Sequence, residues 1–315
     1  MNKEVSIVIL NYKNWRNTLE CLASVLNITY SSYRLIVVDN DSRNNSTEYI
    51  RNWFIDHQIH PLCLSQEQFE TGYYNNNPAV IIQSNLNGGY AAGNNIGIRW
   101  AIRAGSKYVL ILNNDTIVQS GFMEPMVAFL ENSANAVMAG PKVIDSRGNI
   151  DRNCARRRPT VTDYLHRFGV IKVLFPRNKY VLRHYYVDEY DYSYPKEVDV
   201  LSGSCMLIKT EILKVIDFLD ESTFLFLEEF ILCEKLKLIN KSSVIIPESV
   251  IVHKHGSAIS SAPSLNILKS SNESFFYYLK KYRGFSWLLI CLIMYHDYFR
   301  YCYYKIKFII KNNKI

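Results

Sequence analysis

The stretch Val109-Leu110-Ile111-Leu112-Asn113-Asn114-Asp115 decides the fold, because four apolar residues run directly into three polar ones. A continuous apolar run of this kind is typical of a strand buried on both faces of a parallel sheet. Polar groups at the carboxyl end of such a strand lie where α/β sheets bind ligands, and an acid there is suited to hold a divalent metal against a diphosphate. An ordinary Asn-Asp turn would give the same residues, so this motif alone leaves both interpretations open.

Apolar runs and helical spacing alternate on both sides of this stretch. Further strands are expected at Val5–Leu10, Leu35–Val38, Ala79–Gln83 and Ala136–Ala139. Helical spacing is found around residues 19–26, 49–54, 94–104 and 122–130. Strands and helices that alternate at these distances predict an α/β fold, with a mostly parallel central sheet and helices on both faces.

The pattern weakens over residues 145–195, which are rich in Arg and Tyr. A long insertion of this kind is usually either a functional lid or a partly disordered loop. Regular signals return at Val198–Leu201 and Cys205–Ile208, followed by a predicted helix at Phe224–Leu238 and a strand at Val244–Ile246. We therefore expect a catalytic domain over residues 1–264 and a helical tail over residues 265–315.

Positive charge is concentrated in that tail. The chain has 315 residues and a net charge of +7, while residues 269–315 alone hold nine Lys or Arg and two acids. The tail is also aromatic, and residues 285–295 are nearly all apolar but too few to span a bilayer. Either an amphipathic helix on an anionic membrane or a helix packed on the catalytic domain fits this pattern. The rest of the chain is balanced in charge, so a nucleic-acid partner is not expected.

Cysteine spacing and the N-terminus indicate the compartment. The seven cysteines include no CxxC pair, which argues against a zinc site or a disulfide framework. Only a short apolar run precedes Asn11, so no secretory signal is expected. Both features favour a cytoplasmic protein with reduced thiols.

Polar residues follow three of the expected strands, at Asn11-Tyr12, Asp39-Asn40-Asp41-Ser42 and Asn113-Asn114-Asp115. The carboxyl ends of parallel strands share one sheet edge, so these groups should converge on a single crevice. An Asp there can accept the imide N–H of uracil or thymine. The Gly-rich segment Asn87–Gly97 follows the third strand and would let backbone approach a ligand closely. It matches neither GxGxxG nor the phosphate-loop pattern, which argues against a dinucleotide-dependent dehydrogenase.

Two further motifs place ionisable groups in apolar surroundings. Glu228-Glu229 lies inside an apolar run, where a buried carboxylate needs a partner or a role such as general base; an exposed Glu pair is the alternative. His253 and His255 follow a strand, where either side chain could ligate a metal or contact a diphosphate. A structural histidine would look the same.

Taken together in this order, the motifs resemble those of the inverting GT-A glycosyltransferases of family 2, especially the bacterial rhamnosyltransferase-like branch. The resemblance covers about residues 4–260. It is carried by Val5–Tyr12, Val37–Ser42, Asn87–Gly97, Leu112–Thr116, Gly203–Ile208, Glu228-Glu229 and His253.

The resemblance implies a role for each matching position. Asn11 and Asp39 would contact the donor's base, with Tyr12 and Asn40 beside them. Asn87, Gly93 and Asn95 would shape the nucleotide pocket, and Asn113 and Asn114 would shape the turn before the metal. Asp115 and His253 would hold Mg²⁺ or Mn²⁺ on the donor diphosphate. Glu229 would be the general base, with Glu228 as the alternative, because the family usually has Asp at the second position of this pair.

The function that follows is metal-dependent, inverting transfer of a sugar, with rhamnose one candidate, from a dTDP- or UDP-sugar to a hydroxyl of a growing or lipid-linked surface glycan. A lipid-linked acceptor would place the protein on the cytoplasmic face of the inner membrane, bound through its tail. The main alternative is a non-catalytic subunit that binds nucleotide sugars on the same fold. A sugar-1-phosphate nucleotidyltransferase is less favoured, since the Gly-rich loop with Arg and Lys is absent after the first strand.

Overall fold

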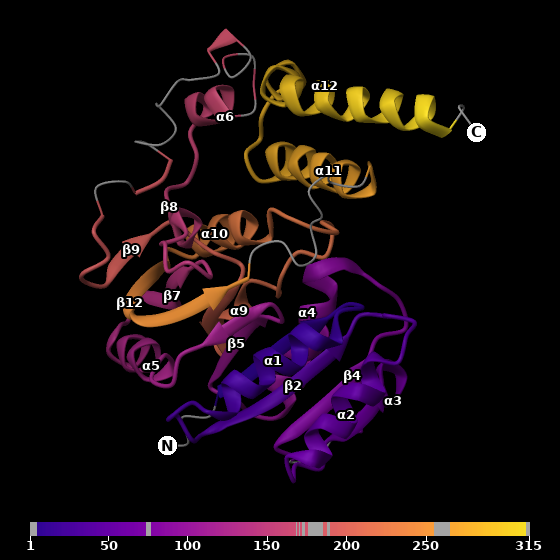
Figure 1. Ribbon diagram of the computed structural model, residues 1–315. Coiled ribbons are helices and arrows are strands. Elements are labelled where there is room, and N and C mark those ends of the chain that lie inside the picture. The colour runs from indigo at the N-terminus through magenta and orange to yellow at the C-terminus, as the bar shows by residue number, and fades with distance from the viewer. Residues whose placement is uncertain are drawn as a thin grey trace.

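One mixed sheet of ten strands forms the centre of this computed structural model, which describes residues 5–73, 77–167, 169, 171, 174–175, 185–187, 190–254 and 265–312 (Figure 1). The strand order is β3-β4-β2-β1-β5-β11-β7-β12-β6, with β9 also paired to β12. The bounds are β1 Val5–Asn11, β2 Tyr33–Asp39, β3 Leu62–Ser65, β4 Ala79–Gln83, β5 Tyr108–Asn113, β6 Thr116–Val118, β7 Ala136–Ile144, β9 Lys196–Val198, β11 Cys205–Lys209 and β12 Ser242–His253. A separate pair joins β8 Ala155–Arg156 to β10 Val200–Leu201.

The strands β3, β4, β2, β1 and β5 form the parallel half of the sheet, which confirms the predicted α/β class. Their apolar runs are almost fully buried, as expected for strands covered on both faces. Asn11 lies opposite Asp39, and Leu10 lies opposite Asn113. The polar ends of these strands therefore meet at one edge, as the sequence predicted.

The other half of the sheet mixes strand directions. β11 pairs antiparallel with both β5 and β7, while β12 runs parallel to β7. The predicted strand Val244–Ile246 is the middle of a much longer strand, β12. Its last residues pair antiparallel with β6 and place His253 opposite Thr116. This long strand is what carries a histidine back to the end of β5.

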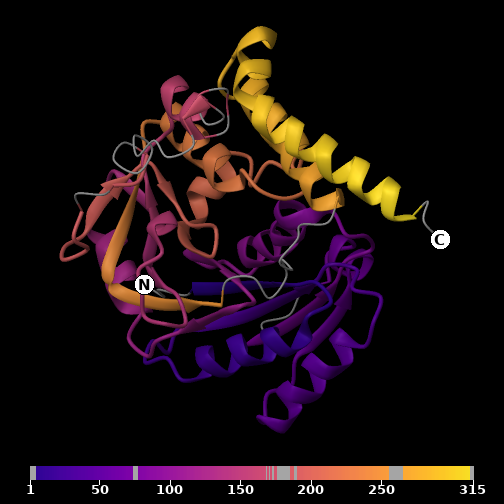
Figure 2. The ribbon, with the colours of Figure 1, turned by 45° about the horizontal axis from the view of Figure 1, so that its top comes forward.

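Helices cover both faces of the sheet, as Figures 1 and 2 show. Their bounds are α1 Trp15–Leu26, α2 Ser46–Asp56, α3 Gln66–Glu70, α4 Gly89–Arg103, α5 Met123–Asn132, α6 Val161–Arg167, α9 Thr210–Val215, α10 Glu228–Leu238, α11 Leu265–Lys281 and α12 Trp287–Asn312. Thr18 of α1 bonds to Asn11, while Gly97 of α4 lies against Val8. Residues 8 and 11 of one strand point to opposite faces, so α1 and α4 sandwich β1.

From the sequence, the Gly-rich residues before Asn94 are expected to form a turn and the helix to begin at Asn94. This expectation was wrong, because most of these residues are helical. The helix α4 begins at Gly89, and only the residues just before it form the turn. Later glycines in the segment serve packing: a Cβ at Gly97 would lie 2.5 Å from a methyl of Val8, and one at Gly93 would lie 2.5 Å from a methyl of Leu10. Glycine here allows the helix to approach β1 closely.

The predicted helix over Phe224–Leu238 was wrong for its first four residues. The helix α10 begins at Glu228, and both Phe226 and Leu227 have left-handed backbone angles. The Phe224 carbonyl accepts a hydrogen bond from the Tyr90 backbone N–H at 2.9 Å. This contact with the start of α4 holds the segment out of the helix, so the two glutamates occupy the first turn of α10.

The tail helices pack on the catalytic body through a second apolar cluster, at the end of the molecule where α6, α11 and α12 lie (Figure 1). Its members come from the 145–195 insertion, α10, α11 and α12, and include Tyr164, Phe230, Phe275, Tyr278, Leu279, Ile290 and Ile293. No helix within the described ranges combines the length and the apolar character needed to cross a membrane.

Candidate active site

Asn11 and Asp39 form a buried hydrogen-bonded pair at the carboxyl edge of the sheet. The Asn11 amide donates to Asp39 Oδ2 at 2.6 Å, and Ser42 donates its backbone N–H to Asp39 Oδ1 at 3.0 Å and its hydroxyl to Oδ2 at 2.6 Å. Thr18 completes the cluster by donating to Asn11 Oδ1 at 2.8 Å. The structure thus brings together the two residues expected to contact the base, and these bonds fix the carboxylate's orientation.

Asn40 connects this edge to the start of α4. Its amide donates to Asn87 Oδ1 at 2.9 Å and to the Gly89 carbonyl at 3.0 Å. Its own carbonyl, Oδ1, is buried without a hydrogen-bond partner among the described residues. A buried acceptor of this kind indicates a place for a donor group from outside the chain. Tyr12 lies at the same edge and is 42% exposed, as a ring available for contact would be.

Two expected pocket residues do not join this cluster. The Asn95 amide donates to the Leu219 carbonyl at 2.9 Å and to Glu221 Oε1 at 2.8 Å, and its Oδ1 accepts from the Leu219 N–H. These bonds hold the loop before α10. Gly93 packs against Leu10 and Asn40. Both residues therefore contribute through packing and loop position.

Asp115 and His253 meet just beyond the end of β5. His253 Nε2 lies 3.1 Å from Asp115 Oδ1, and the two side chains are 15% and 16% exposed. Asn114 lies beside them and donates to Thr18 Oγ1 at 3.0 Å, which links this turn to Asn11 through Thr18. Asn113, the first residue of this turn, is anchored by its backbone N–H, which donates to the Ser204 carbonyl. His255 lies outside the described residues.

The Asp115–His253 pair fits part of a divalent metal site. One carboxylate and one imidazole are a small donor set, and no group of three or more His, Cys, Asp or Glu suited to a metal is found in the part of the chain that the structure describes. Mg²⁺ is commonly bound in this way, through one or two carboxylates together with substrate phosphates. The pair is therefore suited to a metal that arrives with a diphosphate.

The two glutamates at the start of α10 have different surroundings. Glu229 Oε1 accepts from Arg156 Nη2 at 3.0 Å, and this ion pair is largely buried. Glu228 has no such partner: its Oε2 is buried and lacks a hydrogen bond within the described residues. Burial, and then the neighbouring charge of Glu229, raise the pKa of Glu228 to about 8. With its pKa raised to about 8, Glu228 is mostly protonated at neutral pH and can donate a hydrogen bond.

Tyr90 and Gly203 complete the surroundings of Glu228. A Cβ at Gly203 would lie 3.4 Å from Glu228 Oε1, and the Tyr90 hydroxyl donates to the Gly203 carbonyl at 2.7 Å. Removal from water, followed by the charge of Glu228, raises the pKa of Tyr90. Tyr90, Gly203 and the glutamates therefore share one poorly solvated region beside the sheet edge.

Arg156 is the residue that sequence reasoning missed. It also donates to the Leu201 carbonyl at 2.9 Å and lies over the Phe230 ring, with 4.7 Å between the guanidinium carbon and the ring centre. The only signal in the sequence was an Arg-rich insertion of no clear pattern, in which several arginines are equivalent. Only the pairing of β8 with β10 singles out Arg156 as the partner of Glu229.

This mixed α/β sheet, with polar strand ends gathered at one edge, defines a class: proteins of the GT-A fold. The chain belongs to glycosyl transferase family 2, since a model of that family matches residues 6–216. This confirms the family drawn from the motifs, while Glu228-Glu229 and His253 lie beyond the matched residues.

Two characterised relatives are distant. The chain is 26% identical over 239 residues to a low-salt glycan biosynthesis hexosyltransferase of Haloferax volcanii, covering 75% of this chain and 62% of the relative. It is 22% identical over 259 residues to a dTDP-rhamnosyl transferase of Shigella flexneri, covering 81% of this chain and 71% of that protein. The chain thus spans less than two thirds of the first relative's length.

A solved structure shares the fold. It is a mannosyltransferase from Pyrobaculum calidifontis in complex with GDP-Man and Mn²⁺, with a TM-score of 0.56 and 15% identity. The similarity covers 93% of this chain and 68% of the mannosyltransferase. At this identity the comparison supports the fold alone.

Proposed function

We propose that this protein is a metal-dependent, inverting glycosyltransferase that moves a sugar from a nucleoside diphosphate to an acceptor hydroxyl. The observation that carries the proposal is the Asp115–His253 pair at 3.1 Å, next to the polar ends of β1 and β2. Two parts of the chain 138 residues apart supply this pair, and both lie where α/β sheets bind nucleotides.

On the donor side, Asp39, held by Asn11, would face the base, and Tyr12 would lie against it. The unpartnered Asn40 carbonyl and Asn87 would line the same pocket. Asn113 and Asn114 would hold the turn that presents Asp115. A uracil or thymine base suits an Asp acceptor, so a UDP- or dTDP-sugar is the preferred donor, and rhamnose is a candidate because one relative is a dTDP-rhamnosyl transferase.

Asp115 and His253 would hold Mg²⁺ or Mn²⁺ together with the donor's phosphate oxygens. When bound, the metal neutralises charge on the departing nucleoside diphosphate. The Pyrobaculum calidifontis mannosyltransferase was solved with GDP-Man and Mn²⁺, and Mn²⁺ is therefore one of the two metals that we propose to test. Asn95 and Gly93 would act indirectly, by holding the 219–221 loop and by letting α4 approach β1.

Glu229 would accept the proton of the acceptor hydroxyl as that oxygen attacks the anomeric carbon from the face opposite the leaving group. Arg156 holds its carboxylate in place through the ion pair at 3.0 Å. Glu228, protonated near neutral pH, would donate a hydrogen bond instead of accepting a proton. Attack from the opposite face inverts the anomeric configuration.

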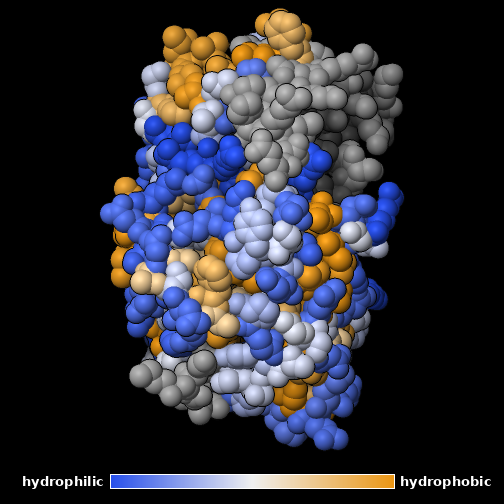
Figure 3. Space-filling model, turned by 90° about the vertical axis from the view of Figure 1, so that its left-hand side faces the viewer, coloured by the Kyte–Doolittle hydropathy of each residue, from blue (hydrophilic) through white to orange (hydrophobic). Residues whose placement is uncertain are grey.

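The tail would bring the protein to an anionic membrane on the cytoplasmic side, where a lipid-linked glycan acceptor is available. Trp287, Leu288, Leu292 and Phe299 of α12 are 41–71% exposed, while Ile293 on the same helix is buried. Hydrophobic side chains gather at the top of the face in Figure 3, the end where α12 lies in Figure 1. An apolar helix face in a basic segment suits an anionic interface. The sequence analysis treated the 145–195 insertion and the tail separately. In this proposal the two segments together cover the side of the protein that binds the acceptor.

A donor screen tests the proposal. Purified protein is incubated with UDP-, dTDP- and GDP-sugars and Mn²⁺ or Mg²⁺, and release of the nucleoside diphosphate is measured. We expect release with at least one donor, loss of release on chelation, and a loss of 100-fold or more in Asp115→Ala at an unchanged melting temperature. Nucleotide binding without release from any donor, or full activity in Asp115→Ala, would contradict the assignment.

A further inference from the structure

A cavity of about 250 Å³ opens beside Glu229. Three separate parts of the chain line it. The 145–195 insertion contributes Arg156, Asp163 and Tyr185, α10 contributes Glu229 and Phe230, and α11 contributes Ser271 and Phe275. A base at the wall of a cavity can act on a hydroxyl held inside it.

The charges that line this cavity are balanced. Two arginines, Arg156 and Arg167, face two acids, Asp163 and Glu229, and one of the arginines is already paired with Glu229. An anion would gain from the arginines but would be repelled by the acids. The Arg-rich character of the insertion therefore does not make this cavity a phosphate site.

Two buried polar side chains in the wall offer opposite hydrogen-bonding groups. Arg156 is 5% exposed and Asp163 is 4% exposed. Arg156 Nε, a donor, and Asp163 Oδ1, an acceptor, are both buried without a hydrogen-bond partner in the described ranges of the chain. A hydroxyl can both donate and accept, whereas an ionised phosphate or carboxylate can only accept. A ligand with several hydroxyls matches this wall.

Aromatic rings supply much of the remaining wall. Phe230, Tyr185 and Phe275 line the cavity, and the first two rings are nearly parallel, at an interplanar angle of 12°. The aliphatic C–H edge of a sugar ring packs well on the electron-rich face of an aromatic ring. The volume is sufficient for about one monosaccharide unit.

We propose that this cavity holds a neutral sugar unit of the acceptor and presents one of its hydroxyls to Glu229. The proposal rests on the function proposed above and makes it more specific, since it selects a glycan end over a lipid phosphate as the attacking group. It also makes α11 part of the acceptor site.

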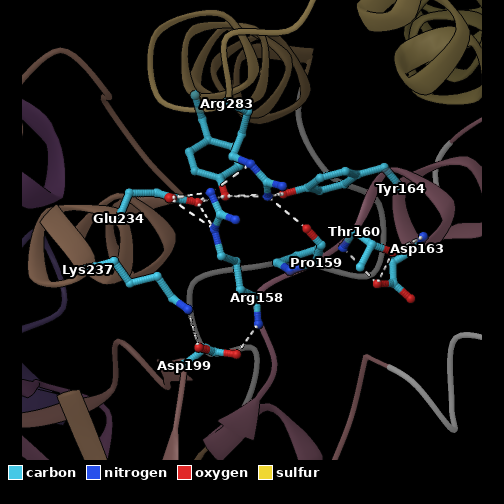
Figure 4. A network of polar contacts seen from close by, with 10 residues as sticks. Arg158, Pro159, Thr160, Asp163, Tyr164, Asp199, Glu234, Lys237 and Arg283 are labelled. Atoms are coloured by element: carbon cyan, nitrogen blue, oxygen red, sulfur yellow. Dashed lines mark hydrogen bonds and ion pairs between the residues drawn. The ribbon is translucent and has the colours of Figure 1, made fainter. Parts of the chain in front are cut away.

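A buried polar network behind the cavity fixes the wall. Arg283 donates to the Pro159 carbonyl at 2.8 Å and to the Tyr164 hydroxyl at 3.0 Å (Figure 4). Thr160 donates its hydroxyl to Asp163 Oδ2 at 2.7 Å, while Asp163 Oδ1 is buried without a partner within the described residues. The insertion and the tail are thus joined at the place where both meet the cavity.

The test uses octyl glycosides of glucose, galactose, mannose and rhamnose, with octyl phosphate of the same chain length for comparison. Binding to the full-length protein is measured by calorimetry, below the concentration at which micelles form. We expect at least one glycoside to bind at least tenfold more tightly than octyl phosphate. Ser271→Trp, which fills the cavity, should weaken that binding at least tenfold, whereas the neighbouring Ser270→Trp, whose side chain does not line the cavity, should not.

Binding of UDP, dTDP and GDP with Mn²⁺ is measured in the same samples. Stronger binding of octyl phosphate, binding of no glycoside, or equal effects of the two Trp substitutions would overturn the cavity assignment. If nucleotide binding persists in those cases, the proposed function stands and only this inference falls. If the wild-type protein binds no nucleotide, the proposed function falls and the inference falls with it.

Discussion

The adjacent residues Glu228 and Glu229 differ in their surroundings, because Glu229 has an arginine partner and Glu228 Oε2 is buried without one within the described residues. Arg156 stabilises the carboxylate of Glu229, while burial keeps the proton on Glu228. Two carboxyl groups with such different environments are suited to opposite roles, one as base and one as hydrogen-bond donor. This difference can be tested with substitutions that change no volume.

Glu229→Gln should lower kcat about 10²- to 10⁴-fold, because the side chain can no longer accept a proton. Glu228→Gln copies the shape and hydrogen bonding of the protonated acid, so we expect it to keep kcat within about tenfold of the wild type. Steady-state rates with the best donor would check both. The reverse order of effects would assign the base to Glu228.

The raised pKa of Glu228 also predicts how stability depends on pH. In the unfolded chain a glutamate loses its proton near pH 4.3, whereas the folded protein holds it up to about pH 8. The folded state therefore binds more protons between these values, and stability falls as pH rises through this window. We expect the melting temperature of the wild type to fall relative to that of Glu228→Gln between pH 5 and pH 8. Parallel curves for the two proteins would contradict this.

At the scale of elements, α12 has one face in the second apolar cluster and another in solvent. Ile290 and Ile293 are buried, while Leu288 and Leu292 are 71% and 41% exposed. The helix therefore packs on the protein, as one of the two interpretations of the sequence expected, and its exposed apolar face is the part that the proposed membrane contact would use.

The exposed face can be tested without disturbing the packed one. We expect the double variant Leu288→Glu, Leu292→Glu to lose binding to vesicles that contain phosphatidylglycerol, because it places charge on the inserting face. The control is Leu238→Glu at the end of α10, where the side chain is 80% exposed. Vesicle flotation measures binding. Retention of the double variant on the vesicles would argue that α12 serves only to pack.

At the scale of the whole molecule, the insertion, α10 and the tail meet at the buried Glu234 (Figure 4). Arg158 donates to Glu234 from both Nε and Nη2 at 2.8 Å, and the Tyr278 hydroxyl donates at 3.0 Å. Arg283 lies 3.7 Å from the same carboxylate. One acid thus joins two arginines that lie 125 residues apart in the chain, Arg158 and Arg283.

Removing that charge should destabilise the protein. Glu234→Gln leaves two arginines around a neutral group, and loss of one partner from a buried ion pair costs about 3–5 kcal/mol. We expect Glu234→Gln to lower the free energy of unfolding by about 3 kcal/mol, the lower end of this range, because Arg158 is partly exposed. Glu273→Gln, which breaks the exposed pair with Lys269, should cost less than about 0.5 kcal/mol. Chemical denaturation at pH 7 measures both, and equal small effects would contradict the role of Glu234.

Local patterns explain why parts of the structure were predictable. Val109–Leu112 is a buried strand because its apolar run has no other stable placement, and its neighbours in the parallel half follow the same logic. The segment Phe224–Leu227 has equally apolar residues yet is not helical, because its conformation is set by the contact of Phe224 with Tyr90. Periodicity carries no information on such a contact.

The sequence by itself determined the α/β class and the convergence of polar groups at one edge, because strands and helices that alternate along the chain predict a parallel sheet. The family was indicated by the ordered series of motifs. Only the tertiary structure decided that His253 lies against Asp115, that Arg156 pairs with Glu229, and that α11 walls a cavity. Each of these depends on pairing between segments far apart in the chain. The free energy of such pairing comes from mutual burial, which no single segment encodes.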